Sequence, residues 1–421
     1  MLLRPLNAAF FEDEARALLT RLARVRPFSL TIPMVKASTI SHAAFQAIEQ
    51  RMLTNRQTLR RRIAAFLAWI RSPRGRTAPP PLQQRRFTVL RLRFNADLDQ
   101  LDIFSDVLTE RSEHEYGIWL AGLDALAADG LRLSYHFFDP PAVMTYLERG
   151  HGAAIRRART RLPGGEENPV AIIQVPRERM IGNGIGCSLI HEVGHQASAL
   201  LGLVPSFQQA MHRHRPWRGL QAAAWDLWQR WLSEIIADFW AVAMLGASAS
   251  SGMIGVLSLP RAFVFRISAD DPHPAPFIRA RLSCAIGQAL YPDDQWGRLD
   301  RLWRSFYPLA GVSAAHRAML AALEATMPGL VRLLVEHRPA SLRGLSMRAC
   351  LPVAERQPAN LRALFPAGGT APSRLRGMRP TLAFAVFGQA RLDGRVDAGG
   401  ESEQLGRLLE HWALRREGAE N

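Results

Sequence analysis

Cysteine is scarce in this sequence, with only Cys187, Cys284 and Cys350 among 421 residues. Three widely spaced cysteines exclude a disulfide framework as the source of stability and are typical of a reducing compartment. The N-terminal stretch also lacks the apolar core and the small-residue cleavage site of a secretory signal peptide. We therefore expect a cytoplasmic location.

Long apolar runs are scarce too. The longest uncharged run extends from Phe239 to Pro260, and half of it is Ala, Gly and Ser, with Asp238 at its edge. A stretch of this length could cross a bilayer, but its small residues favour a buried helix followed by a turn. The sequence thus predicts no transmembrane segment.

Lysine is the third shortage, because Lys36 is the only one and arginine supplies nearly all of the positive charge behind a net charge of +16. Such a preference for arginine is what a GC-rich coding bias would produce. We expect the arginines to be scattered over solvated faces, since no block of them is interleaved with aromatic residues. The alternative is that the charge recruits an acidic partner, nucleic acid or an anionic surface, and nucleic acid is not favoured.

Hydrophobic residues make up 48% of the chain and charged residues 21%, which is ordinary globular composition. We expect an α+β fold that is mostly helical. Apolar spacing of three and four residues predicts a helical N-terminal region at 1–71, and prolines predict a linker at 72–86. A main domain would follow at 87–336, and a C-terminal region at 337–421 has no role that the sequence reveals.

Alternating or short apolar runs predict strands at Phe87–Phe94, Leu131–Phe138, Pro169–Val175 and Leu382–Phe387. Helical periodicity predicts helices at Ser41–Arg71, Asp97–Asp129, Ser188–Leu201, Leu220–Leu245, Phe277–Leu290, Gln295–Tyr307, Ala314–Glu336 and Leu405–Arg416. A second linker is expected at Pro366–Gly377.

The stretch from His191 to His195 reads H-E-V-G-H. Residues four apart lie on one helical face, so the two imidazoles can bind one zinc ion. Glu192 lies toward the same side, close enough to accept a proton from a water that zinc has acidified. The pattern therefore predicts a nucleophile-generating zinc site, although chance alone produces a lone H-E-x-x-H in many proteins.

A catalytic zinc ion needs a third protein ligand, and Glu234 is the candidate. It stands in the apolar stretch WLSEIIADFWAV with Asp238 four residues later, on the same helical face. Two carboxylates on a buried helix are costly unless they meet a cation or strong donors. Glu234 would bind zinc and Asp238 would accept a hydrogen bond from a zinc-binding histidine. The alternative is a pair of salt bridges to arginine.

A third element, DPHPAPFIR, extends from Asp271 to Arg279. Prolines on both sides hold His273 rigidly, so it could donate a hydrogen bond to an oxyanion at the zinc. Arg279 would lie on the following helix, where it could brace Asp238 or Glu234 or hold a substrate carboxylate. The alternative is a capped turn with a surface histidine and arginine.

This order of motifs, H-E-x-x-H, E-x-x-A-D and H-P-x-x-x-x-R, resembles the gluzincin zinc metallopeptidases, and most closely their HtpX-like and CAAX prenyl endopeptidase-like branch. The resemblance covers about residues 169–285. It implies that His191, His195 and Glu234 bind zinc, that Glu192 is the general base, and that Asp238 supports the ligands. The motif His273-Pro274 with Arg279 has the same spacing as in that branch. Many members of that branch carry transmembrane helices, whereas this sequence predicts none. The resemblance is therefore not taken to imply a membrane substrate for this chain.

The predicted function is zinc-dependent hydrolysis of peptide bonds, with a gluzincin-like core at 87–336 and a protein or peptide as substrate. Glu192 would take a proton from water and pass it to the leaving amine, and His273 would stabilise the oxyanion. PVAIIQV, at 169–175, would be an edge strand that aligns the substrate. The alternative is a non-catalytic zinc protein that binds an acidic partner, but a structural site has no need for Glu192. The oligomeric state is not predicted.

Three further features are expected to be structural. Trp225, Trp228 and Trp231 have helical spacing and should belong to the core, whereas Trp217 precedes them. Cys187 is expected to pack at a helix start, the alternative being an inhibitory metal ligand. The segment 212–218 should be a solvated loop.

Overall fold

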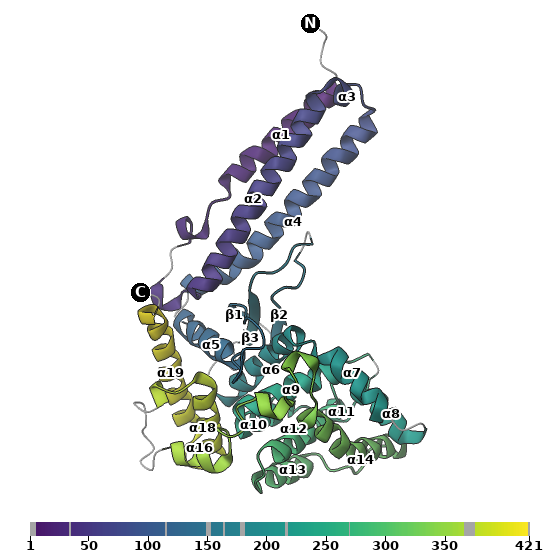
Figure 1. The fold of residues 1–421 in the computed structure, drawn as a ribbon, viewed down its shortest axis with the longest axis vertical. Helices are drawn as coiled ribbons and strands as arrows, with labels where there is room; N and C mark the ends of the chain where they lie inside the picture. Colours follow the sequence, from purple (N-terminus) through teal and green to yellow (C-terminus); the bar gives the residue numbers. More distant parts are fainter. Residues whose placement is uncertain are drawn as a thin grey trace.

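A long helical arm projects from a mostly helical body in the computed structural model (Figure 1). The structure describes residues 6–32, 35–113, 116–148, 153–162, 165–176, 182–214, 218–268, 270–365 and 375–419. The arm consists of α1 (Leu6–Arg24), α2 (His42–Arg71), α3 (Pro73–Arg76) and α4 (Pro80–Glu113). The predicted helix at 41–71 is confirmed, with the Ser41 side chain accepting a hydrogen bond from the Ala44 N–H at its start.

The predicted linker at 72–86 is wrong, because most of it is helical. Ser72 caps the one-turn helix α3, and α4 begins at Pro80. Proline is tolerated in the first turn of a helix, where its missing N–H has no partner to lose. The prolines therefore mark a tight helix–helix connection at the outer end of the arm.

The predicted strand at 87–94 is also wrong, since it lies inside α4. Phe87, Leu90 and Phe94 are buried, and their spacing of three and four residues is that of one helical face. Val89 and Leu92 completed the apparent alternation, but both are exposed. The alternating pattern thus came from apolar residues on two different faces of a helix.

A three-stranded sheet lies at the base of the arm, with strand order β1-β3-β2. β1 (Val143–Glu148) is parallel to β3 (Ala171–Pro176), and β2 (Ala154–Arg156) is antiparallel to it. The predicted strand at 169–175 is confirmed as β3, but its predicted edge position is wrong. β3 is central, consistent with the burial of five of its six residues, and β2 is an edge strand.

The predicted strand at 131–138 is wrong, and residues 143–148 form a strand instead. Residues 131–138 have no partner strand among the described residues, and Tyr135 is exposed. Alternation alone does not create a strand, because the backbone groups need a neighbouring strand to pair with. Both edges of β3 are already occupied, by β1 on one side and by β2 on the other, so residues 131–138 do not pair with it.

The body contains the remaining helices. They are α5 (Gly117–Gly130), α6 (Asn183–Leu200), α7 (Leu203–His214), α8 (Gly219–Arg230), α9 (Leu232–Leu245), α10 (Ala247–Leu257), α11 (Arg261–Val264), α12 (Pro276–Leu290), α13 (Gln295–Phe306), α14 (Ala314–Glu336), α15 (Met347–Cys350), α16 (Pro358–Leu364), α18 (Pro380–Leu392) and α19 (Ala398–Ala419). The helices predicted at 188–201, 277–290, 295–307, 314–336 and 405–416 each overlap one of them. Short 3₁₀ turns are η1 (Phe28–Leu30), η2 (Lys36–Ser38) and η4 (Ala340–Leu342). The helix predicted at 220–245 is two helices that meet at Trp231.

The C-terminal region joins the main core of the body. α19 packs against α5, and α18 packs against α9 and α10. The strand predicted at 382–387 is wrong, because it lies inside α18, whose residues are buried on nearly every side. A helix without a polar face looks like a buried strand when only a short apolar run is read. Most of the second linker, residues 366–374, lies outside the described residues.

The uncharged run from 239 to 260 forms the end of α9 and all of α10, and both helices are largely buried. The buried helix is therefore confirmed, but a second helix takes the place of the turn. Among the described residues, one helix, α14, is long and apolar enough to cross a membrane, and half of its most apolar window is buried in the body.

One buried carboxyl in the arm makes stability depend on pH. Burial and the nearby Glu166 raise the pKa of Asp97 from 3.8 to about 6, against the opposing effect of Arg62. The folded pKa is above the unfolded one, so stability is highest when Asp97 is protonated and falls as the pH rises from about 4 to about 6. We expect Asp97→Asn to stabilise the protein at neutral pH by about 2 kcal/mol, a gain absent below about pH 4.

Thermal unfolding of both proteins across this pH range measures the effect. Asp99→Asn on the exposed side of the same helix is the matched control, with an expected change within about 0.5 kcal/mol. Equal melting temperatures for Asp97→Asn and the unmodified protein at neutral pH would show that the buried carboxyl carries no penalty.

Candidate metal centre

Two helices that cross at close range bring the three predicted ligands together. α6 carries His191 and His195 one turn apart, and α9 carries Glu234. The helices pack tightly because Gly194 faces α9, where an added Cβ would lie 2.8 Å from the Cα of Ala237. The middle of the H-E-V-G-H stretch is therefore a contact point between the two ligand-bearing helices.

The three side chains converge on one point. Single ligand atoms of His191, His195 and Glu234 all lie within 4.8 Å of one another. The Glu234 carboxylate is 3.1 Å from Nε2 of His191 and 3.3 Å from Nε2 of His195. Two imidazoles and one carboxylate are the donor set of catalytic zinc sites, which leave a fourth position open. The residues therefore fit a metal ion, and the predicted ligand set is brought together as expected.

Behind the ligands, Asp238 holds His191 in place. Its Oδ1 lies 2.7 Å from Nδ1 of His191, on the far side of the ring from Glu234. Arg279, on α12, donates from Nε and Nη2 to the two oxygens of Asp238, at 2.7 and 2.8 Å. Both positions match the sequence prediction, and this arrangement leaves the Nε2 atom of His191 facing the ligand group.

The acidic and basic groups in this cluster stabilise the ionised forms of one another. Burial alone would raise the pKa of Asp238, but Arg279 and His191 lower it to about 2. Burial alone would lower the pKa of His191, but Asp238 and Glu234 raise it to about 9. Three histidines likewise hold the pKa of Glu234 well below its usual range. Glu234 and Asp238 are thus ionised at neutral pH. A metal cation bound at the ligand group would take the place of the protons that the histidines share with these two carboxylates.

His273 also reaches the ligand group. Its Nε2 lies 3.2 Å from Glu234, and that contact is the main cause of its raised pKa. Its Nδ1 lies 2.9 Å from Asp271, which also accepts a hydrogen bond from the His273 N–H. Asp271 was not predicted, although it precedes the proline that fixes the histidine. The His273 side chain is half-exposed.

Glu192 is buried beside the ligands, at one wall of a cavity of about 210 Å³. His191, His273 and Arg279 line the same cavity, and Met253, Val256 and Leu257 form an apolar wall. Burial raises the pKa of Glu192, and the two histidines of α6 oppose that shift. A carboxylate in this setting is a stronger base than one in water.

Two other contacts of the site were missed by sequence reasoning. The Ser233 hydroxyl lies 3.3 Å from Nδ1 of His195, where it can orient that ring. Gln196 accepts a hydrogen bond from the Ala158 N–H at 2.8 Å and so ties the segment after β2 to α6. Ser233 precedes Glu234 and Gln196 follows His195, so adjacency to a ligand was the only signal available.

The residues expected to be structural can now be placed. Trp225, Trp228 and Trp231 are buried in the main core, as predicted, and Trp217 lies outside the described residues. Cys187 is buried in the first half of α6 and lines the cavity. The group of described residues that could hold a metal ion does not include it. Residues 215–217 of the expected loop also lie outside the described part, whereas 212–214 end α7.

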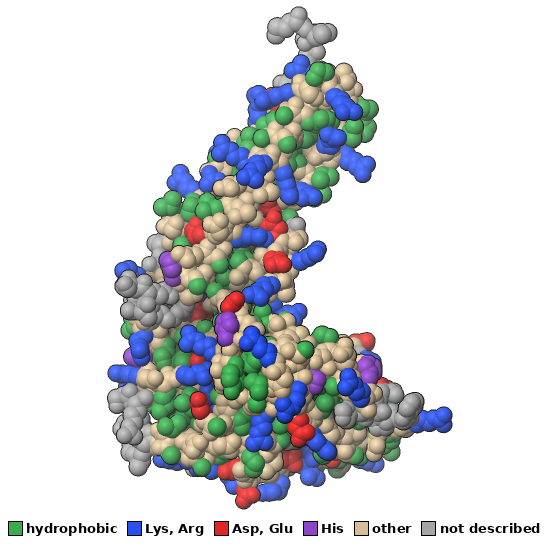
Figure 2. Space-filling view, viewed as in Figure 1, with side chains coloured by type: hydrophobic (Ala, Val, Ile, Leu, Met, Phe, Trp, Pro, Cys, Tyr) green, Lys and Arg blue, Asp and Glu red, His purple; other side chains and the backbone are tan. Residues whose placement is uncertain are grey.

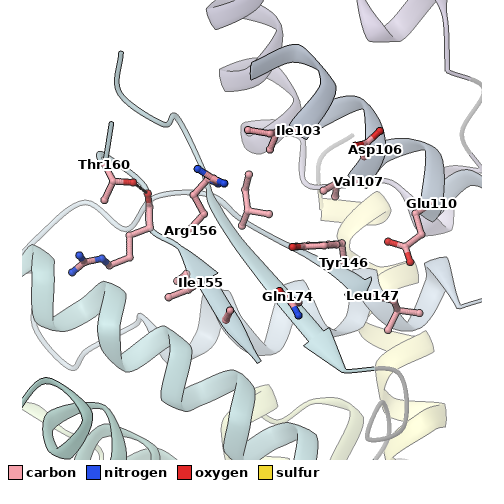
Figure 3. Close-up of a pocket in the computed structure, with 13 residues that line it drawn as sticks. Ile103, Asp106, Val107, Glu110, Tyr146, Leu147, Ile155, Arg156, Thr160 and Gln174 are labelled. Atoms are coloured by element: carbon pink, nitrogen blue, oxygen red, sulfur yellow. Dashed lines mark hydrogen bonds between the residues drawn. The ribbon is translucent and has the colours of Figure 1, made fainter. Parts of the chain in front are cut away.

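A larger groove, of about 810 Å³, crosses the opposite face of the sheet (Figure 3). Ile173 of β3 faces the core beneath α6, whereas Ile172 and Gln174 face α4 and line the groove. Two carboxylates of α4, Asp106 and Glu110, lie at one end of it. Arg156 of β2 lies at the other end. The edge strand β2 thus lines the charged groove, and Ala153, just before it, lines the cavity beside the candidate metal ligands.

We expect Gly194→Ala to destabilise the protein by about 1–3 kcal/mol and to weaken zinc binding, because the new methyl group meets the backbone of α9. The displacement of α9 would move Glu234, one turn away, from the two histidines. Gly255→Ala on α10 is the matched control, because an added Cβ there has open space, and it should stabilise by about 0.5–1 kcal/mol. Melting temperature and zinc affinity measure both effects, and a Gly194→Ala protein that melts as late as the Gly255→Ala protein would contradict the close packing.

Comparisons with known proteins add nothing to this geometry. The sequence matches no protein-family model and no curated protein, and the structure matches no solved structure.

Proposed function

We propose that this protein is a zinc-dependent endopeptidase. The observation that carries the proposal is the convergence of His191, His195 and Glu234 on one point, with Glu192 buried beside them in a cavity. A structural metal site needs four protein ligands and no base, whereas a hydrolytic site needs an open position and a base. The described residues offer three ligands and one base.

Zinc bound by these ligands would acidify a water molecule and polarise the scissile carbonyl. Glu192 would accept the proton of that water and deliver it to the leaving amine. His273, held by Asp271, would donate a hydrogen bond to the oxygen that gains negative charge. Asp238 and Arg279 would keep His191 in one orientation during these steps.

The edge strand β2 is the proposed guide for the substrate backbone. It pairs with β3 on one side only, and Ala153, just before it, lines the cavity that contains Glu192. An extended peptide that adds to the free edge of β2 would pass the metal centre with its backbone hydrogen-bonded. Every second side chain of that peptide would point into the charged groove on the other face of the sheet. β2 therefore takes the role that the sequence suggested for β3.

Incubation of the zinc-loaded protein with an unfolded polypeptide tests the proposed function. We expect internal cleavage products, loss of cleavage after chelation of zinc, and recovery when zinc is restored. Mass spectrometry of the products locates the cleaved bonds. Zinc binding without any cleavage of a broad peptide library would refute the proposed activity and favour a non-catalytic zinc protein.

A further inference from the structure

The positive charge of the chain is concentrated on the arm. Residues 51–96 contain twelve arginines and no aspartate or glutamate, so this stretch carries twelve of the sixteen net positive charges. The fold gathers it on α2, α3 and the outer half of α4 (Figure 1). These arginines lie mostly on solvated faces, as expected, but a helical hairpin brings two basic segments side by side and so concentrates them.

Few of these arginines are neutralised within the protein. Arg51 pairs with Glu166 at the base of the arm, and Arg71 pairs with the buried Glu12. The exposed arginines that form no ion pair with any described residue are Arg60, Arg61, Arg74, Arg76, Arg85, Arg86, Arg91 and Arg93. The acids that flank this stretch in the sequence are Glu49 and Asp97, and α1 adds Glu12, Asp13 and Glu14. The outer arm therefore presents a strong excess of guanidinium groups to solvent.

Large apolar side chains are exposed among these arginines. On α4 the exposed fractions of Leu82, Val89 and Leu92 are 40%, 49% and 60%. These residues recur at helical spacing with Arg85, Arg86 and Arg93, so one face of the helix is both apolar and basic.

The start of α1 extends this surface. Leu6 is 86% exposed and Phe10 57%. The Asn7 side chain donates a hydrogen bond to Gln83, which holds α1 beside the beginning of α4. We call the combined surface the arm patch: Leu6, Phe10, Leu82, Arg85, Arg86, Val89, Leu92 and Arg93. Figure 2 shows hydrophobic and basic side chains together at this end of the molecule.

We propose that the arm patch binds the surface of a membrane that contains anionic phospholipids. Arginine guanidinium groups bind phosphate oxygens through paired hydrogen bonds, and each basic residue near such a surface contributes about 1 kcal/mol. Phenylalanine and leucine side chains at the same end would enter the boundary between headgroups and acyl chains. The two kinds of side chain on one face match the two layers of that boundary.

The apolar half of the patch decides between partners. A nucleic acid would satisfy the arginines but would leave Phe10, Val89 and Leu92 in water, since its backbone offers no apolar surface. A lipid surface accepts both kinds of side chain. Trp69 helps to hold one basic side chain of the arm patch at the surface, because the Arg86 guanidinium lies 4.3 Å above its ring. This inference does not depend on the zinc chemistry.

Sedimentation of the full-length protein with vesicles tests the proposal. We expect binding to vesicles of phosphatidylcholine mixed with phosphatidylglycerol to be at least about tenfold tighter than to phosphatidylcholine alone, and to weaken with salt. The triple variant Arg85→Gln, Arg86→Gln, Arg93→Gln should weaken binding by about 100-fold. The triple variant Leu82→Ser, Val89→Ser, Leu92→Ser should also weaken it, although its charge is unchanged.

The matched control is Arg298→Gln, Arg301→Gln, Arg304→Gln on the exposed side of α13, which removes the same charge from the body and should leave binding unchanged. Circular dichroism of each variant confirms that it is folded. Equal loss of binding in the control and the arginine variant would overturn the proposal. Tight, salt-dependent binding to sheared DNA that the serine variant retains, without binding to anionic vesicles, would overturn it in favour of a nucleic-acid partner.

Discussion

Glu192→Gln is expected to reduce peptide hydrolysis by about 10²–10⁴-fold while zinc binding stays intact. Glu192 faces the cavity beside the ligands and is not one of them. Glutamine keeps the shape of the side chain but cannot accept a proton from water. The loss should therefore appear in kcat, with little change in the affinity for a bound peptide.

The control for this variant is Glu336→Gln, an exposed glutamate at the end of α14 that is outside the cavity. It should retain full activity. Metal analysis of both variants separates loss of the base from loss of zinc. A Glu192→Gln protein that binds zinc and cleaves peptides at the unmodified rate would falsify the assignment of Glu192 as the base.

Arg279→Met is expected to cost about 3–5 kcal/mol of unfolding free energy, because it leaves the buried carboxylate of Asp238 without its counter-charge. The Arg279 side chain makes two hydrogen bonds to Asp238, and both groups are shielded from solvent. The zinc affinity should also fall by about 10–100-fold, because Asp238 would no longer hold His191 in a fixed orientation.

The double variant Arg279→Met, Asp238→Asn is the matched comparison. It removes the uncompensated charge, so we expect much of the lost stability to return while the zinc affinity stays low. Chemical denaturation measures the free energies, and competition with a zinc chelator measures the affinity. Equal stability of the single variant and the unmodified protein would contradict the buried ion pair.

The residues of the site could be predicted from the sequence because they occur as two pairs, and the two members of each pair lie on the same helix. A spacing of four residues puts His191 beside His195 and Glu234 beside Asp238, whatever the rest of the fold does. Contacts between distant segments left no such signal. The edge position of β2 and the link from Gln196 to Ala158 depend on how strands and helices assemble.

The fold was predicted closely at α2 and α14, whereas parts of α4 and α18 were mistaken for strands. The ends of α14 were predicted as found, and α2 differed by one residue. α18 is buried on nearly every side, and in α4 apolar residues lie on two faces, so both looked like strands at residues 382–387 and 87–94. The charge of the arm was misjudged for a related reason. The run of twelve arginines without an acid at 51–96 could have been read from the sequence, but only the path of α2 and α4 shows that its two halves lie side by side.

The central claim is that His191, His195 and Glu234 form a zinc site, and the zinc content of the purified protein tests it most directly. Elemental analysis after growth with zinc should find about one zinc ion per chain, and the same value for Glu192→Gln. His191→Ala and Glu234→Ala should each lose most of the metal. A folded, unmodified protein without zinc, or full zinc content in both alanine variants, would contradict the account.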